Sequence, residues 1–210
     1  MDSAGIAHSG STLRDAPAGV ACYDRDEPGR VLRALPQVFL AHLRVAAAMA
    51  AEHGQRQNGG QQPVKIALAE AAAGVLERDN DNRGARVDEY QKSANGALGE
   101  AWCAKFVYWC YDQAARRLRV KNPLPPIFGA AQLELWGIRE KKQVPTPGIG
   151  DICIARHRHA GLATGSATPS GIFPSVEGNT WAKSDYARRR EGVYALNKEK
   201  VDQCTFFRVV

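Results

Sequence analysis

Apolar residues recur at three- and four-residue spacing along much of the chain, which is the period of an amphipathic helix. In one such segment Phe106, Cys110 and Ala114 fall on the side that would be buried. Pro63 opens another segment, and proline is tolerated in the first turn of a helix. The pattern predicts helices over residues 36–53, 63–78, 87–94 and 129–141, and a further helix that carries Cys103 in its first turn and runs to about residue 118.

The sequence pattern changes after Pro147. Short runs of β-prone residues follow one another, separated by glycines, as in an antiparallel sheet. The predicted strands are residues 151–156, 160–166, 171–177, 193–196 and 205–210. Helices first and strands afterwards are typical of an α+β fold.

Two stretches without hydrophobic periodicity organise the N-terminal part of the chain. Residues 1–35 are rich in Gly, Ala, Ser, Pro and Asp, so they are predicted to be loop. Residues 54–62 are polar and rich in Gly and Gln, which is the composition of a linker. We therefore expect an N-terminal extension over 1–62, containing the helix 36–53, and a second domain over 63–210.

The net charge of +6 is carried by one part of the chain. Residues 1–60 hold six basic and six acidic residues, so the remaining 22 basic and 16 acidic residues supply all of it. A basic segment of this kind favours binding to nucleic acid, an acidic membrane surface or an anionic cell wall. The charge can also serve solubility alone. The basic cluster Arg188–Arg190 lies near Trp181 but matches no recognition helix or RNP-like strand. We expect no specific nucleic-acid partner.

Cysteine usage and the N-terminal sequence bear on the cellular compartment. Five cysteines are an odd count, which fits a reducing compartment or a thiol kept free for chemistry. No Cys-x-x-Cys pair is present, which excludes a zinc ribbon and a thioredoxin-like motif. The N-terminus lacks a secretory signal, and the apolar run 38–51 is too short to span a bilayer. We therefore expect synthesis in the cytoplasm and no membrane span.

The most informative segment is Gly99-Glu-Ala-Trp-Cys-Ala-Lys-Phe-Val-Tyr-Trp-Cys110. It places Cys103 just inside the first turn of a strongly apolar helix, with Gly99 and Glu100 as cap or first-turn residues. A helix N-terminus carries unpaired N–H groups and partial positive charge, which favours a thiolate over a thiol. The backbone N–H of Cys103 is a candidate oxyanion donor. Cys110 is expected to be core.

Two later segments supply partners for this thiol. His157 and His159 alternate along a predicted strand and compete for the role of base, and we favour His159 because His157 lies between two arginines. Glu177 and Asn179 alternate in the same way around Gly178, so both are predicted to face the imidazole. Either can accept its second N–H.

Metal binding is a weaker interpretation of two segments. Residues 79–84, Asp-Asn-Asp-Asn-Arg-Gly, begin like a calcium loop, but Arg83 occupies the fifth position and Tyr90 the twelfth, where an acid is needed. Cys153, His157 and His159 have the chemistry of zinc ligands, yet no fourth ligand is evident. We expect no metal and no cofactor.

The ordered set Trp-Cys-Ala-Lys-Phe-Val-Tyr-Trp-Cys, His-Ala-Gly-Leu and Glu-Gly-Asn-Thr resembles the CHAP family, the cysteine- and histidine-dependent amidohydrolases and peptidases of papain-like fold. The similarity covers roughly residues 64–210. It implies an enzyme that cleaves amide bonds in bacterial peptidoglycan, between sugar and first amino acid or within the peptide and cross-bridge. It implies the catalytic set Cys103 (nucleophile), His159 (base), Glu177 (orienting the imidazole) and Asn179, with Tyr90 or Gln91 as second oxyanion donor.

Other functions remain open at this level. The chain could act on another amide as a papain-like peptidase or acyltransferase, bind the wall without catalysis, or bind nucleic acid through its charge. Residues 1–60 match no known segment and would serve as a docking or delivery segment, an inhibitory cover or an inert extension. A wall enzyme without a signal peptide would reach the cell wall or periplasm by a non-classical route.

Overall fold

The computed structural model describes residues 60–127, 129–182 and 190–209. The chain divides into two units, Met1–Arg44 and Val45–Val210, and every described residue belongs to the second. Residues 1–59 of the predicted extension, with its helix over residues 36–53, therefore lie outside the described residues.

The helices follow the predicted order with changes at their ends. The first described helix covers residues 60–72, so the last three residues of the predicted linker are helical. This helix was expected to reach residue 78, but Gly74 adopts a φ of 67°, the left-handed conformation that ends helices. The others are α2 (Ala85–Ser93), α3 (Cys103–Leu118) and α4 (Ala130–Arg139). The prediction that Cys103 lies in the first turn of a helix that ends near Leu118 is confirmed, although the helix begins at Cys103 itself, later than the expected cap residues Gly99 and Glu100.

Six antiparallel strands form one sheet in the order β1-β6-β2-β3-β4-β5. They are β1 (Gln143–Val144), β2 (Ile152–Ala155), β3 (His159–Ala163), β4 (Ile172–Thr180), β5 (Gly192–Lys200) and β6 (Cys204–Phe207), with a single 3₁₀ turn η2 (Val201–Gln203) before β6. Five of the six strands match predicted ones, and the two-residue β1 was not predicted. The α+β class is confirmed.

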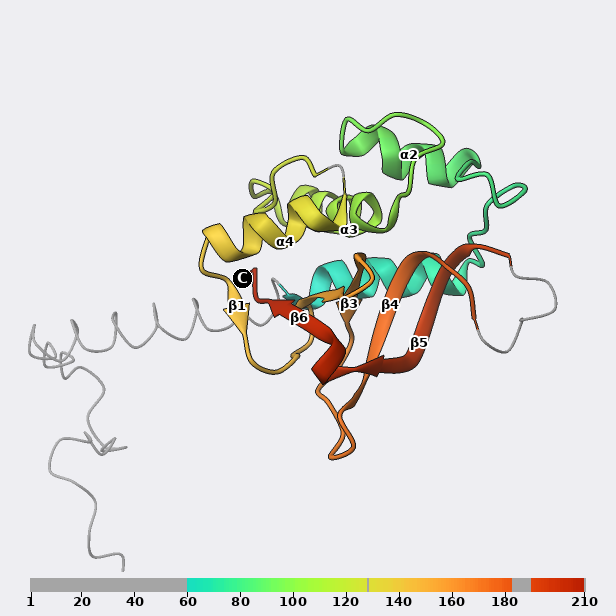
Figure 1. Ribbon diagram of the computed structural model, residues 1–210. Coiled ribbons are helices and arrows are strands. Elements are labelled where there is room, and N and C mark those ends of the chain that lie inside the picture. Colours follow the sequence, from blue (N-terminus) through green and yellow to red (C-terminus); the bar gives the residue numbers. More distant parts are fainter. Residues whose placement is uncertain (1–59, 128, 183–189, 210) are drawn as a thin grey trace, which may run out of the picture. The chain divides into compact units, whose positions relative to one another are not determined.

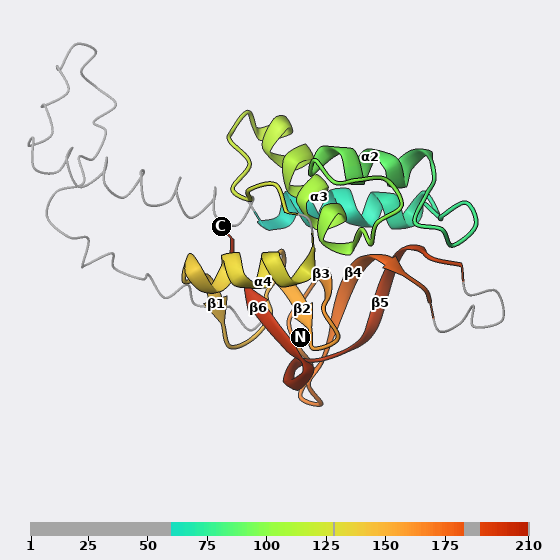
Figure 2. The ribbon, with the colours of Figure 1, turned by 45° about the horizontal axis from the view of Figure 1, so that its top comes forward.

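The described helices lie on one side of the sheet, as both ribbon views show (Figure 1, Figure 2). The main core lies between these layers. The sheet contributes the alternating residues Ile152, Ile154, Ala160, Leu162 and Val176, and the helices contribute aromatic side chains such as Trp102, Phe106 and Tyr111. Burial of this interface supplies the main stabilisation of the fold, because apolar area removed from water contributes about 25 cal/mol per Å².

A smaller apolar cluster covers the other face of the sheet. It consists of Cys153, Ala163, Phe173 and Phe206, with Phe173 and Phe206 in edge-to-face contact at 5.1 Å between centroids. Burial on both faces explains why β2 is a continuous apolar run rather than an alternating one. Within the described residues, no helix is both long enough and apolar enough to cross a lipid bilayer.

The arrangement brings distant segments of the chain together at the start of α3. This helix packs on β3 and β4, the two strands that carry the predicted His159 and Glu177. Gly178 permits the close approach, since a Cβ at this position would lie 2.4 Å from the Trp102 ring and 2.9 Å from that of Phe106.

Candidate active site

The candidate nucleophile opens α3. Trp102 is the N-cap residue, and the first helical hydrogen bond runs from Phe106 N–H to Trp102 C=O at 2.8 Å. Cys103 is therefore the first helical residue, and its backbone N–H has no acceptor within the helix. Glu100 was expected at the cap or in the first turn, but it precedes the helix and forms an ion pair with Lys105. The Cys103 side chain is buried, with 7 % of the residue exposed.

The imidazole lies at the first residue of β3. His159 Nε2 is 3.1 Å from Glu177 Oε2, and these side chains are 16 % and 1 % exposed respectively. The contact has the distance of an ion pair rather than the alignment of an in-line hydrogen bond. Because Nε2 faces the carboxylate, Nδ1 is the nitrogen directed to the thiol, and a hydrogen bond between His159 and Cys103 completes the chain.

The sheet register explains how Glu177 reaches the ring. Gly161 stands directly opposite Glu177, two residues after His159 on β3. A Cβ at Gly161 would lie 2.6 Å from Glu177 Cγ, so only glycine lets this side chain cross β3 toward the imidazole. Ser175 Oγ donates a hydrogen bond to Glu177 Oε1, which leaves Oε2 for His159.

Contacts within this group determine both pKa values. Burial raises the pKa of Cys103, but the hydrogen bond and charge of His159 and the backbone N–H groups of Ala160 and Ala104 outweigh it, so the pKa falls below 9.0. Burial likewise lowers the pKa of His159, but contacts with Cys103 and Glu177 raise it from 6.5 to about 10. Both shifts favour a thiolate–imidazolium pair, the reactive form of a cysteine nucleophile.

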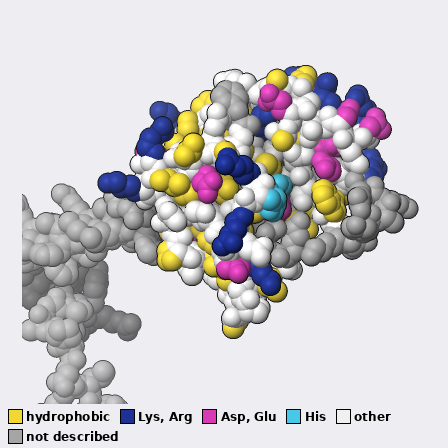
Figure 3. All heavy atoms as spheres, viewed as in Figure 1, with side chains coloured by type: hydrophobic (Ala, Val, Ile, Leu, Met, Phe, Trp, Pro, Cys, Tyr) yellow, Lys and Arg dark blue, Asp and Glu magenta, His cyan; other side chains and the backbone are white. Residues whose placement is uncertain are grey.

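His157 lies beside this pair without joining it. Its ring stacks on that of His159, with 5.7 Å between centroids and 11° between planes. Both histidines therefore project to one side, as predicted, and only His159 contacts Glu177. On the face shown in Figure 3 the histidine side chains reach the surface beside Lys and Arg side chains, which agrees with the exposed Arg156 and Arg158.

Asn179 has a different position from the one predicted. Regular alternation would direct it to the imidazole with Glu177, but β4 is irregular between Glu177 and Thr180, and Asn179 has a φ of 58°. Its Oδ1 accepts a hydrogen bond from the backbone N–H of Trp102 at 2.9 Å. Asn179 therefore contacts the residue before the nucleophile, and its amide N–H groups are directed to Glu77, Asn82 and Glu191.

The side chains of Tyr90 and Gln91, the predicted oxyanion donors, already donate their hydrogens to other groups. Tyr90 is fully buried and donates its hydroxyl to Glu70 at 2.5 Å. The amide of Gln91 donates to the carbonyl oxygens of Asn82 and Glu100 at 3.0 and 2.7 Å. Both N–H bonds of this amide are thus engaged in holding neighbouring loops, and the prediction for Tyr90 and Gln91 is wrong for these side chains.

The residues weighed as metal ligands form no such site. Among the described residues, no group of three or more His, Cys, Asp and Glu side chains could hold a metal ion. In the predicted calcium loop, Asp81 instead forms an ion pair with Arg78 and accepts a hydrogen bond from the backbone N–H of Arg83 at 3.0 Å. These contacts cap the turn.

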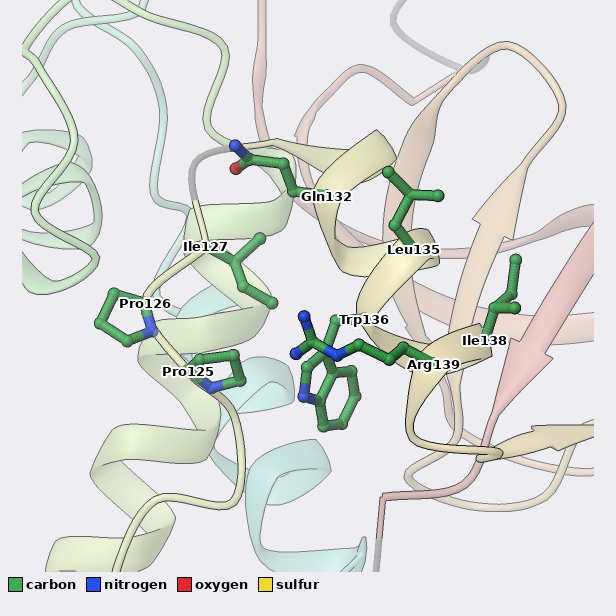
Figure 4. A pocket seen from close by; sticks show the side chains of 8 residues that line it. All are labelled: Pro125, Pro126, Ile127, Gln132, Leu135, Trp136, Ile138 and Arg139. Atoms are coloured by element: carbon green, nitrogen blue, oxygen red, sulfur yellow. The ribbon is translucent and has the colours of Figure 1, made fainter.

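A groove of about 680 Å³ lies elsewhere on the molecule, between α4 and the segment that precedes it (Figure 4). Its lining is mostly apolar: Pro125, Pro126, Ile127, Gln132, Leu135, Trp136, Ile138 and Arg139. None of these residues contributes to the group around Cys103, so the groove is separate from the candidate active site.

Two contributors to the site were missed by sequence reasoning, Ser175 and Glu77. Ser175 precedes Glu177 by two residues and shares its face of β4, so strand alternation could have indicated it. Glu77 accepts from the indole N–H of Trp102 at 2.7 Å, and no local pattern signals a contact between residues so far apart. Comparison of the chain with protein-family models, curated proteins and solved structures finds no match.

Proposed function

We propose that this chain is a cysteine-dependent amidohydrolase or endopeptidase that cleaves amide bonds in peptidoglycan through a thioester acyl-enzyme. The observation that carries the proposal is the chain of contacts from Cys103 through His159 to the buried Glu177. Nucleophile, base and orienting carboxylate in this order are what acyl transfer requires. A cysteine at a helix N-terminus against a histidine on a sheet is also consistent with a papain-like fold.

The reaction follows from these positions. The Cys103 thiolate attacks the amide carbonyl, and the backbone N–H of Cys103 stabilises the oxyanion that forms. The C–N bond then breaks as the His159 imidazolium gives its proton to the leaving amine, which leaves a thioester. Neutral His159 next takes a proton from water, the hydroxide attacks the thioester, and the thiolate departs with the imidazolium restored.

Glu177 orients the ring throughout this cycle. Its Oε2 faces Nε2, which directs Nδ1 to the sulfur and to the leaving group in turn. Its negative charge also stabilises the imidazolium that both half-reactions require, which is reflected in the raised pKa of His159.

Peptidoglycan as the substrate is supported by two features of the sequence. The three motifs around Cys103, His159 and Glu177 occur in the order that the CHAP resemblance requires. The net charge of +6 suits a protein that works on an anionic cell wall. Action in the wall or periplasm would follow from this substrate.

Mass spectrometry of peptidoglycan fragments tests the proposal. We expect the parent chain to release fragments with new amide-derived ends, and Cys103→Ala to release none, a loss of at least about a thousandfold. Cys204→Ala is the matched control, because it removes another cysteine side chain, one that lies outside the site. Identical fragments from Cys103→Ala and the parent would overturn the assignment of the nucleophile.

A further inference from the structure

The residue before the nucleophile is held by a ring of hydrogen bonds. The indole Nε1 of Trp102 donates to Glu77 Oε1 at 2.7 Å, and the backbone N–H of Trp102 donates to Asn179 Oδ1 at 2.9 Å. Asn179 Nδ2 donates to Glu77 Oε1 at 3.1 Å, which closes the ring. Main chain and side chain of Trp102 are thereby fixed together.

Glu77 is the acceptor on which this ring converges. It is 1 % exposed, and its second oxygen accepts from the backbone N–H of Asn82 at 2.9 Å. Its own backbone N–H donates to the carbonyl oxygen of Glu191 at 2.8 Å, which anchors the segment after the first helix beside β5. A carboxylate is costly to bury unless hydrogen bonds replace its hydration, and here three donors do so.

The ring joins the two layers that supply the reacting groups. Trp102 directly precedes Cys103 on the helical side, and Asn179 follows Glu177 by two residues on β4. Glu77 contacts both, so it couples the position of the sulfur to that of the strand that orients the imidazole. An apolar residue in its place could fill the space but could not hold two donors at fixed positions.

Glu191 complements this arrangement. Its Oε2 accepts from Asn179 Nδ2 at 2.9 Å, so two carboxyl groups lie around one amide. Burial first, and then the charge of Glu77, raise the pKa of Glu191.

We propose that Glu77 is a positioning residue for the nucleophile, whose carboxylate fixes the N-terminal turn of α3 against β4 through Trp102 and Asn179. The inference rests on the proposed function, since it takes Cys103 as the nucleophile. The rate at which the Cys103 thiol is alkylated nevertheless tests the role of Glu77 without any peptidoglycan.

The test compares Glu77→Gln with Glu70→Gln. Glu70 is the matched control, because it is also a buried carboxylate, 8 % exposed and ion-paired with Arg86 at 2.6 Å, but it does not contact Trp102 or Asn179 in the network above. The readouts are the rate of iodoacetamide alkylation at Cys103, located by peptide mapping, the release of peptidoglycan fragments, and the midpoint of thermal unfolding.

We expect Glu77→Gln to slow alkylation of Cys103 about tenfold and hydrolysis at least as much, because the amide has no charge and has one acceptor oxygen where Glu77 uses two. Glu70→Gln should lower the unfolding midpoint as well but leave the alkylation rate within about twofold of the parent. Equal slowing by the two variants, or no slowing by Glu77→Gln, would overturn the proposal.

Trp102→Phe provides a second route if Glu77→Gln does not fold. This variant keeps an aromatic ring in the core and removes the indole N–H together with the five-membered ring that carries it, so it should also slow alkylation. Where both variants fold, the double variant should be no slower than Glu77→Gln alone, since the two residues act through one contact. Additive effects of the two substitutions on the alkylation rate would contradict the proposed ring of hydrogen bonds.

The two proposals fail in different ways. If Cys103 of the parent reacts no faster than an ordinary thiol, or Cys103→Ala still hydrolyses peptidoglycan, the proposed function is wrong. If Cys103 of the parent is reactive and both Glu77→Gln and Trp102→Phe leave its rate unchanged, only the role of Glu77 is wrong.

Discussion

His159, the base of the proposed reaction, has contacts that oppose the effect of its burial. Removal from water favours the neutral ring, and the contacts with Cys103 and Glu177 favour the charged one. The contacts outweigh the effect of burial, and the pKa of His159 rises to about 10. The imidazolium is therefore the resting form at neutral pH, and its proton is available for the leaving amine.

Alkylation and hydrolysis should depend differently on pH. Both rise on the acid side as Cys103 loses its proton, below the ordinary pKa of 9.0. Above about pH 10 His159 becomes neutral, so hydrolysis should fall because the leaving amine is no longer protonated. Alkylation needs only the thiolate and should continue. Rates of both reactions from about pH 5 to about pH 11 check this expectation.

Glu177→Gln is the control for this profile. Loss of the carboxylate removes one of the two contacts that raise the pKa of His159, so the alkaline limb of hydrolysis should move to lower pH. The stability that this raised pKa provides is full below pH 6.5 and is lost as the pH rises through about 10. An alkaline limb that stays in place in Glu177→Gln would show that this carboxylate does not act on His159.

At the level of elements, the site depends on two strands that are paired in register. Gly161 faces Glu177, and the space above its Cα is filled by the Glu177 side chain. A side chain added there would move either the carboxylate or the strand, because a protein interior has little free volume.

Gly161→Ala should therefore lower hydrolysis at least tenfold, since the new Cβ would lie 2.6 Å from Glu177 Cγ and displace the carboxylate from His159. Gly129→Ala is the matched control, because Gly129 has an extended φ of −163° and no atom lies within 4 Å of an added Cβ. Fragment release and thermal unfolding of the two variants check the prediction. Full activity in a folded Gly161→Ala protein would contradict the crossing of β3 by Glu177.

The order of elements and three site residues could be predicted because local signals determine them. Helical spacing placed Cys103 in the first turn of α3, although it put the cap two or three residues too early, and motif order selected His159 and Glu177. Asn179 could not be placed, because alternation assumes a regular strand and β4 is irregular at that point. The irregularity depends on tertiary contacts that spacing along the chain does not record.

Side-chain partners across the fold were beyond sequence reasoning for the same reason. Tyr90 and Gln91 have the chemistry of oxyanion donors, and only the structure shows that Glu70 and two loop carbonyls already accept their hydrogens. Glu77 lies 25 residues before Trp102 and 102 residues before Asn179, with no periodicity connecting them. Contacts of this kind follow from the packing of layers.

At the scale of the whole molecule, the site belongs to neither layer alone. The sulfur comes from the helical layer, and the imidazole and the carboxylate come from the sheet. The net charge of +6 is a separate property of the chain. Long-range attraction to an anionic polymer therefore affects how often substrate arrives, whereas the geometry at Cys103 determines the chemical step.

This separation of charge and site predicts that salt changes the hydrolysis of peptidoglycan but not the alkylation of Cys103. Raising the ionic strength from about 0.01 M to about 0.15 M shortens the Debye length from roughly 30 Å to roughly 8 Å. The net charge of +6 is then screened, so KM for peptidoglycan should increase several-fold while kcat changes little. Alkylation of Cys103 by iodoacetamide, a neutral reagent, is the control and should be unaffected. If salt slows both reactions equally, it acts on the site itself; if it slows neither, the basic surface does not attract the substrate.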